Sequence, residues 1–136
     1  MISSSHRNVT NIGQININGP SVTSQTSFEK FFHDQSMSLC ALQEVNLTDE
    51  RLDDLRPTID IAYLAKAKND NTRGVALAVK NNLHPQRCLE LEEPDVDIVW
   101  CIVNIGPLKV MVASAYCTPA PSNDSLKKLI GNVKKV

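Results

Sequence analysis

The feature that most constrains the fold is a strand–helix–strand pattern near the start of the chain. Residues 11–16 are predicted to form a strand, and the apolar run 39–42 a second strand that is buried on both faces. Residues 27–35 between them have the spacing of a helix. Two strands joined through a helix can pair in parallel, so that both end at the same edge of a sheet. The pattern indicates an α/β fold with a mixed sheet.

The predicted helix carries an aromatic stripe. Phe28, Phe31 and Phe32 follow one another at i, i+3 and i+4, the spacing of one helical face. Such a stripe could stack on nucleic-acid bases, but rings at helical spacing more often belong to a hydrophobic core. We therefore expect all three rings to pack inward.

Polar side chains follow both predicted strands. Asn16 and Asn18 come at the end of the first strand, and Glu44 comes at the end of the second. A carboxylate beside an amide offers half of a site for a hard cation such as Mg²⁺. Two plainer interpretations stay open, because asparagines form turns by bonding their own backbone and a carboxylate at a strand end can simply face water.

Strong turn signals separate the strands in the middle of the chain. A short helix is predicted at 49–56, where Pro57 ends it, and a strand follows at 59–65. The turn-rich residues 69–74 precede a very apolar strand at 75–79. The two strands on either side of this turn are expected to form a hairpin.

A second hairpin is predicted further on. Residues 96–104 and 109–116 have strand composition, and the turn residues Gly106 and Pro107 join them. A short strand at 88–91 is expected to precede this hairpin.

The composition is that of an ordinary globular protein. The 136 residues carry a net charge of −1 and are 42% hydrophobic, so no overall basic surface argues for nucleic acid. No apolar run approaches the ~18 residues that cross a bilayer, and the polar N-terminus lacks the apolar core of a signal peptide. We expect one domain without a membrane segment, in an intracellular compartment, cytoplasmic or nuclear.

The four cysteines are Cys40, Cys88, Cys101 and Cys117. They are widely spaced, form no Cys-x-x-Cys pair, and lie mostly in apolar runs. We expect them to be buried, reduced thiols that act as small hydrophobic residues.

Four segments together resemble a known family. In order they are GQINING at 13–19, LQE at 42–44, RGVALAVK at 73–80 and ASAYCTP at 113–119. Each is common alone, but their order and spacing are similar to those of the endonuclease/exonuclease/phosphatase family. The resemblance is closest to the endonuclease domain that non-LTR retrotransposons place ahead of their reverse transcriptase.

The resemblance implies a partial fold of the α/β (α+β) class. The family has a four-layer α/β/β/α sandwich of well over 200 residues, roughly the upper part of the usual domain range. Residues 1–9 are expected to be a flexible tail, and 10–136 the N-terminal half of that domain, ending in a helix capped by Ser122 or Asn123. The Gly-Asp-Phe-Asn-like strand end, the later Asp and the Ser-Asp-His of the family are not found in this sequence.

The resemblance also implies roles for five residues. Glu44 and Asn16 would hold the metal ion, Mg²⁺ or Mn²⁺, with Asn16 orienting the metal or a neighbouring residue. Tyr116 would donate a hydrogen bond to the phosphate, and Asn18 and Arg73 would contact the substrate. Without the family, Tyr116 is equally a strand aromatic bonded to a nearby carbonyl, and Arg73 a surface charge beside a turn.

The implied activity is metal-dependent cleavage of a DNA phosphodiester, with no small-molecule cofactor besides the metal. Because the family's acid/base groups are not in this sequence, we expect negligible activity from the chain alone. Two alternatives stay open: another branch of the family, such as a sphingomyelinase, an inositol-phosphate phosphatase or an abasic-site repair nuclease, or a non-catalytic remnant that serves as an interaction module. Strands 75–79 and 96–102 are expected to be exposed sheet edges that promote self-association.

Overall fold

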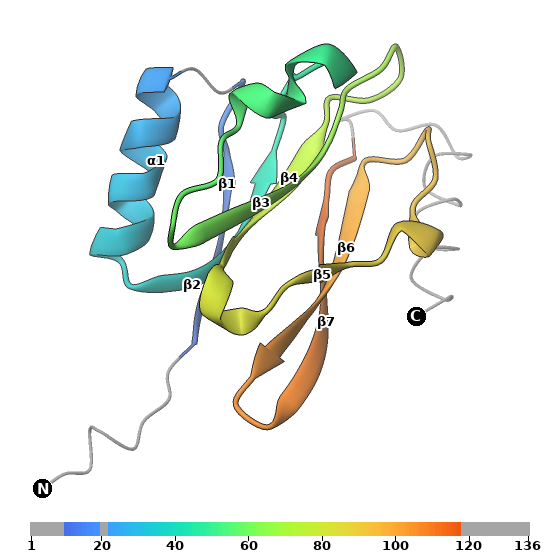
Figure 1. The fold of residues 1–136 in the computed structure, drawn as a ribbon. Coiled ribbons are helices and arrows are strands. Elements are labelled where there is room, and N and C mark those ends of the chain that lie inside the picture. Colours follow the sequence, from blue (N-terminus) through green and yellow to red (C-terminus); the bar gives the residue numbers. More distant parts are fainter. Residues whose placement is uncertain (1–9, 20–21, 118–136) are drawn as a thin grey trace, which may run out of the picture.

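The computed structural model describes residues 10–19 and 22–117 (Figure 1). The predicted tail at 1–9 and the helix predicted from Ser122 or Asn123 lie outside the described residues. Among the described residues no helix is long and apolar enough to cross a membrane.

The first sheet contains four strands, which are β1 (Asn11–Asn16), β2 (Met37–Gln43), β3 (Ile61–Lys66) and β4 (Val75–Lys80). Their order in the sheet is β1-β2-β4-β3. β1 and β2 pair in parallel, as the helix α1 (Val22–Asp34) between them allows, and β4 pairs antiparallel with both β2 and β3. The mixed sheet and the β3–β4 hairpin were both predicted.

The second sheet is antiparallel and contains β5 (Gln86–Arg87), β6 (Ile98–Ile105) and β7 (Leu108–Ala115) in that order. β6 and β7 form the predicted hairpin around Gly106, whose φ of +59° suits a tight turn. In the described part of the chain, three 3-10 helices connect the strands: η2 (Asp49–Asp54), η3 (Asn81–Leu83) and η4 (Leu89–Leu91).

The two sheets pack face to face, and the period of two along their strands explains how. The layer between them consists of aliphatic side chains and one thiol from β2, β4 and β6: Leu39, Val75, Leu77, Val79, Val99, Cys101 and Val103. The intervening residues of β4, Ala76 and Ala78, face α1 instead. The described chain therefore has three layers, α1, the first sheet and the second sheet (Figure 1).

The helix α1 packs on the outer face of the first sheet through Phe28 and Phe32, which are 7% and 0% exposed. The expectation that Phe31 packs with them was wrong, because Phe31 is 40% exposed. Successive helical residues are rotated by about 100°, so Phe31 lies at the rim of a stripe centred near Phe28 and Phe32.

The prediction of a strand at 88–91 was wrong. After Arg87 one more backbone hydrogen bond joins this segment to β6, from the Cys88 N–H to the Trp100 carbonyl at 3.0 Å. The chain then turns into η4, where the Leu91 N–H donates to the Cys88 carbonyl at 3.1 Å. Leu89 is exposed, so the apolar residues of this segment do not form a buried strand. The helix predicted at 49–56 is present as the shorter η2.

The prediction of an exposed edge was wrong for strand 75–79, because β4 is paired with β2 on one side and with β3 on the other. β6 lies between β5 and β7, but β5 pairs in register only with Cys101 and Ile102 of β6. Within the described residues, the remaining length of β6 has β7 as its one paired strand. Three of the four cysteines are buried as expected, whereas Cys117 is exposed.

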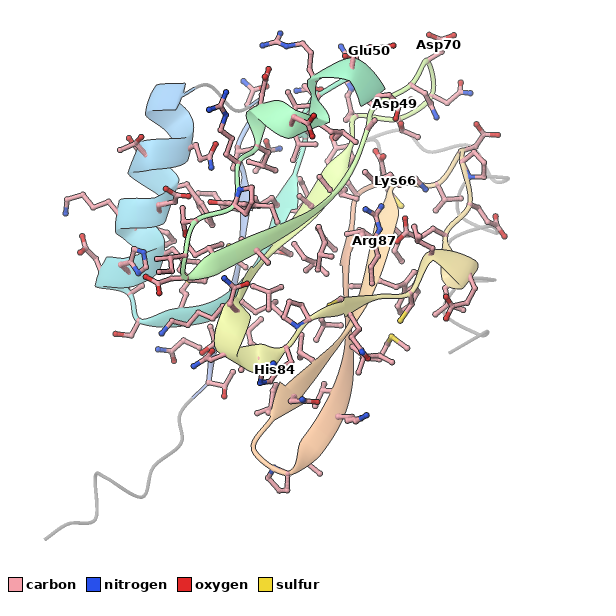
Figure 2. The ribbon with its side chains drawn as sticks, in the orientation of Figure 1. Asp49, Glu50, Lys66, Asp70, His84 and Arg87 are labelled. Atoms are coloured by element: carbon pink, nitrogen blue, oxygen red, sulfur yellow. The ribbon has the colours of Figure 1, made fainter. Side chains whose placement is uncertain are left out.

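Two basic residues hold the loop that enters β6. Lys66 donates from Nζ to the carbonyl oxygens of Glu93 and Val96, the latter at 2.6 Å. Arg87 forms two hydrogen bonds with Glu92, at 2.9 and 2.8 Å. Figure 2 labels Lys66 and Arg87, which come from β3 and β5 respectively. Both sheets thus contribute to fixing residues 92–97.

Candidate active site

The parallel pairing of β1 and β2 brings two predicted site residues together. Asn16 pairs with Gln43, so the amide lies beside the residue that immediately precedes Glu44. The backbone continues this pairing past the strand ends, because the Gly19 N–H donates to the Glu44 carbonyl at 2.7 Å. The two segments are therefore held together where their polar side chains begin.

The side-chain amide of Asn16 has a defined orientation. Its Oδ1 accepts the Asn18 N–H at 3.0 Å, which closes a turn. Because Oδ1 faces Asn18, the Nδ2 group is the donor in the hydrogen bond that links Asn16 to the Glu44 carboxylate. Asn18 has a φ of +48° and an exposed side chain, so its observed contribution to this turn is its backbone.

Tyr116 reaches the same carboxylate from the second sheet. Its hydroxyl donates to Glu44 Oε1 at 2.8 Å. The buried Ser114 helps to fix this approach, since its Oγ donates to the Leu42 carbonyl at 3.1 Å and accepts from Gln43 Nε2 at 3.4 Å. The end of β7 is thereby tied to the end of β2.

These neighbours keep Glu44 ionised. The hydrogen bonds from Asn16 and Tyr116 lower the pKa of Glu44, and the nearby charge of Arg73 adds to this effect, while partial desolvation opposes it. The same hydrogen bond to Glu44 raises the pKa of Tyr116, so its hydroxyl stays a donor. At neutral pH the site presents a carboxylate whose charge is stabilised by two donors.

The backbone of Glu44 is also unusual. Its φ of +53° is in the left-handed region, which costs a non-glycine residue about 1–2 kcal/mol. Two donors hold its carbonyl in this conformation, Gly19 N at 2.7 Å and Asn46 Nδ2 at 3.1 Å. Conformations of this kind are kept where the surrounding structure fixes them, often at functional sites.

Arg73 lies beside Glu44 on the turn that enters β4. Its carbonyl accepts the Asn46 N–H at 2.8 Å, and the Gly74 carbonyl accepts the Val45 N–H at 3.2 Å. The turn therefore pairs with the two residues that follow Glu44. The Arg73 side chain is exposed and close enough for its charge to act on the carboxylate.

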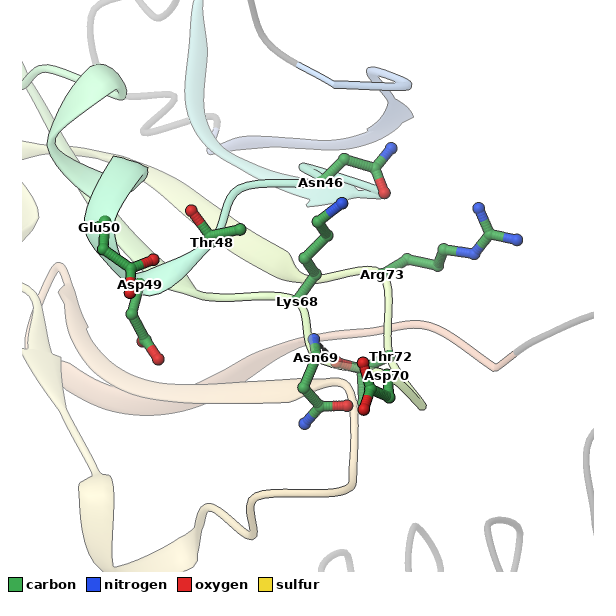
Figure 3. Close-up of a pocket in the computed structure, with 9 residues that line it drawn as sticks. All are labelled: Asn46, Thr48, Asp49, Glu50, Lys68, Asn69, Asp70, Thr72 and Arg73. Carbon is green, nitrogen blue, oxygen red and sulfur yellow. Dashed lines mark hydrogen bonds between the residues drawn. The ribbon is translucent and has the colours of Figure 1, made fainter.

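A pocket opens next to this turn (Figure 3). Arg73 and Asn46 border both the pocket and the surroundings of Glu44. Two of the three carboxylates of the pocket, Asp49 and Glu50, lie on the side away from Arg73, and the third, Asp70, lies next to Thr72. The full lining comprises Asn46, Thr48, Asp49, Glu50, Lys68, Asn69, Asp70, Thr72 and Arg73. Glu44 itself is beside the pocket and not in its wall.

The donor set fits a magnesium ion that keeps most of its water. No group of three or more His, Cys, Asp or Glu side chains that could hold a metal occurs in the described part of the chain. Mg²⁺ is commonly bound by only one or two carboxylates together with waters and substrate phosphates, so a single ionised Glu44 is chemically sufficient for a partial site. The orientation of Asn16 suits it to holding Glu44 in place, because its Nδ2 faces the carboxylate.

Sequence reasoning missed Asp97, Ser114 and Asn46, which fix the surroundings of Glu44. Asp97 had a visible signal, since it is a carboxylate within the apolar run predicted as a strand at 96–104. It is only 5% exposed. No sequence pattern singled out Ser114 or Asn46, because small polar residues are common at such positions.

Comparisons with known proteins bear on the fold. No family model matches the chain, and no curated protein matches it. Among solved structures, the endonuclease domain of TRAS1, a telomere-specific non-LTR retrotransposon, is similar with a TM-score of 0.64 and 17% identity, over 90% of this chain and 51% of that one. The AP endonuclease LMAP from Leishmania major is similar with a TM-score of 0.62 and 14% identity, over 90% of this chain and 43% of that one.

The chain thus spans about half the length of these two structures. At such low identity the similarity establishes the fold, and the predicted resemblance is confirmed at that level. The three described layers correspond to the mixed α/β class that was predicted. In its fold the chain is of the endonuclease/exonuclease/phosphatase type.

Proposed function

We propose that the chain carries the metal-ligand part of a Mg²⁺-dependent DNA endonuclease site of the retrotransposon type. The observation that carries the proposal is the convergence of Asn16 and Tyr116 on the carboxylate of Glu44, with the hydroxyl of Tyr116 at 2.8 Å. Two residues, one from each sheet, meet at this acid, and this occurs in a fold shared with two endonucleases.

In this proposal Glu44 binds the cation, Mg²⁺ or Mn²⁺, and Asn16 fixes the orientation of its carboxylate. A bound cation would neutralise charge on the phosphoryl oxygens of a DNA phosphodiester. Tyr116 has one hydroxyl proton, which is donated to Glu44 in the absence of substrate and would be donated to the phosphate in its presence. Arg73 adds a positive charge beside the same phosphate, and Asn18 shapes the turn next to it.

The 136 residues alone are proposed to be catalytically inactive or nearly so. Glu44 can hold a metal, but in the family the acid/base pair and a further Asp, Asn and His come from segments that this sequence does not contain. Groups that act as a unit lose most of their effect when some are removed. The GQINING opening at 13–19 and the short connections favour the retrotransposon type over the other branches of the family.

The test is nicking of supercoiled plasmid by the purified 136-residue chain in Mg²⁺. We expect no nicking above the level of Glu44→Ala, from protein shown by circular dichroism to be folded. Nicking that disappears with EDTA and in Glu44→Ala would contradict the proposed inactivity and keep the role of Glu44. Nicking that persists in Glu44→Ala would contradict the proposed site.

A further inference from the structure

Asp97 is a buried carboxylate outside the convergence at Glu44. It is 5% exposed, and its two oxygens accept different backbone donors: Oδ2 accepts the Arg73 N–H at 2.8 Å and Oδ1 accepts the Gly74 N–H at 3.1 Å. One side chain thus holds two consecutive residues of the turn that enters β4.

The turn passes this constraint on to Glu44. The carbonyls of Arg73 and Gly74 accept the N–H groups of Asn46 and Val45, at 2.8 and 3.2 Å, and these are the two residues that follow Glu44. Val45 is completely buried, and the left-handed backbone of Glu44 requires its flanking residues to be fixed. The path from Asp97 to Glu44 therefore consists of two sets of hydrogen bonds, joined by the backbone of residues 73–74 and 44–46.

The main chain of Asp97 makes a second connection. Its carbonyl accepts the N–H of Tyr116 at 3.0 Å, and Tyr116 is the residue whose hydroxyl reaches Glu44. Lys66 fixes the segment ahead of Asp97 by donating to the carbonyl of Val96 at 2.6 Å. A single residue therefore contacts both the turn that carries Arg73 and the strand end that carries Tyr116.

Burying a carboxylate as deeply as Asp97 is energetically unfavourable. Burial raises the pKa of Asp97, and the backbone donors of Arg73 and Gly74 oppose that rise. Hydrogen bonds from the turn offset the loss of water around the carboxylate, and an apolar replacement would leave buried N–H groups without an acceptor. An apolar side chain here could not bind two adjacent N–H groups.

We propose that Asp97 is a positioning residue that fixes the Arg73–Gly74 turn, and through it the backbone that follows Glu44, for metal binding. The proposal rests on the proposed function, because it assigns Asp97 a task in the site of which Glu44 is the ligand. The proposal assigns Asp97 no contact with the cation, because its side chain is buried and both of its oxygens accept hydrogen bonds from the turn.

The test uses Asp97→Asn in the full 136-residue chain. The amide is nearly isosteric, but its NH₂ group must face one of the two N–H donors, so one of the two hydrogen bonds is lost. Asp53→Asn is the charge-matched control because Asp53 is exposed on η2, and Ile61→Val, a buried β3 residue, is the control for a general loss of stability.

The first readout is amide hydrogen exchange, which needs no metal. We expect Val45 and Asn46 to exchange about tenfold faster in Asp97→Asn relative to Leu77 in β4, although the side chain of residue 97 contacts neither of them. A general loss of stability would speed amide exchange equally at Val45, Asn46 and Leu77, and that result would overturn the proposal.

The second readout is the affinity for Mn²⁺, measured from the electron paramagnetic resonance signal of free Mn²⁺. Residues that orient a ligand typically change metal affinity 10- to 100-fold, so we expect Asp97→Asn to bind about tenfold more weakly while both controls match the wild type. An affinity within about twofold of the wild type would overturn the proposed role in metal binding. If the wild-type chain binds no Mn²⁺ at Glu44, the proposed function fails, and the exchange rates of Val45 and Asn46 still decide whether Asp97 fixes the Glu44 backbone.

Discussion

Replacing Gly74 by alanine tests the turn on which the site depends. Gly74 has a φ of +83°, and a Cβ at this position would lie 2.8 Å from Val45 Cγ2 and 2.9 Å from the Lys66 carbonyl oxygen. The left-handed conformation costs alanine about 1–2 kcal/mol, and forced overpacking adds about 1–3 kcal/mol. Alanine also lowers the conformational entropy of the unfolded chain, which stabilises the folded state by about 0.4–1 kcal/mol. We expect Gly74→Ala to lower the free energy of unfolding by about 1–5 kcal/mol, with a central value of about 3 kcal/mol.

Gly106→Ala is the matched control. Gly106 has a φ of +59°, but a Cβ there would have no atom within 4 Å, so only the conformational cost applies, a net loss of about 1 kcal/mol. Urea denaturation followed by circular dichroism measures both variants. If Gly74→Ala is no more destabilising than Gly106→Ala, the turn does not pack against Val45 and Lys66, and the reasoning that fixes Arg73 beside Glu44 is refuted.

Two further predictions concern the core. Phe32→Ala should lower the free energy of unfolding by about 3–5 kcal/mol, because Phe32 is fully buried. Phe31→Ala should lower it by less than about 1 kcal/mol, because Phe31 is 40% exposed. Equal losses for the two variants in urea denaturation would contradict the orientation of α1. Burial raises the pKa of Cys40 and Cys101 to about 11, so these thiols favour the folded state below their ordinary pKa of 9.0 and oppose it as the pH rises toward 11. The melting temperature should therefore fall from pH 9 to 11. At pH 8, iodoacetamide should modify the exposed Cys117 and leave Cys40 and Cys101 unmodified. Rapid modification of Cys40 in the folded protein would contradict this prediction.

Local patterns predicted the parts of the fold that local physics determines. The strand at 11–16 and both hairpins were recognisable because turn residues and the period of two act over a few positions. The apolar strand β4 was recognisable because it is buried on both faces. Its place in the interior of the sheet was not predicted, because pairing with β2 joins residues far apart in the sequence.

The candidate site was only partly predictable for the same reason. The parallel pairing of β1 and β2 puts Asn16 next to Glu44, and that follows from the strand–helix–strand pattern. The hydrogen bond from Tyr116 to Glu44 spans 72 positions, and the bonds from Arg73 and Gly74 to Asp97 span 24 and 23. Contacts of this length depend on how the two sheets pack, which no short motif encodes.

The location of bound Mn²⁺ shows directly whether Glu44 is the metal ligand. A ¹⁵N-labelled 136-residue chain is titrated with Mn²⁺, which broadens the amide signals closest to the ion. The account predicts that broadening is strongest around Asn16, Glu44 and Tyr116 and is lost in Glu44→Gln. Broadening that centres on Asp49 and Asp70 in the neighbouring pocket, or that is unchanged in Glu44→Gln, would contradict the assignment of Glu44 as the metal ligand.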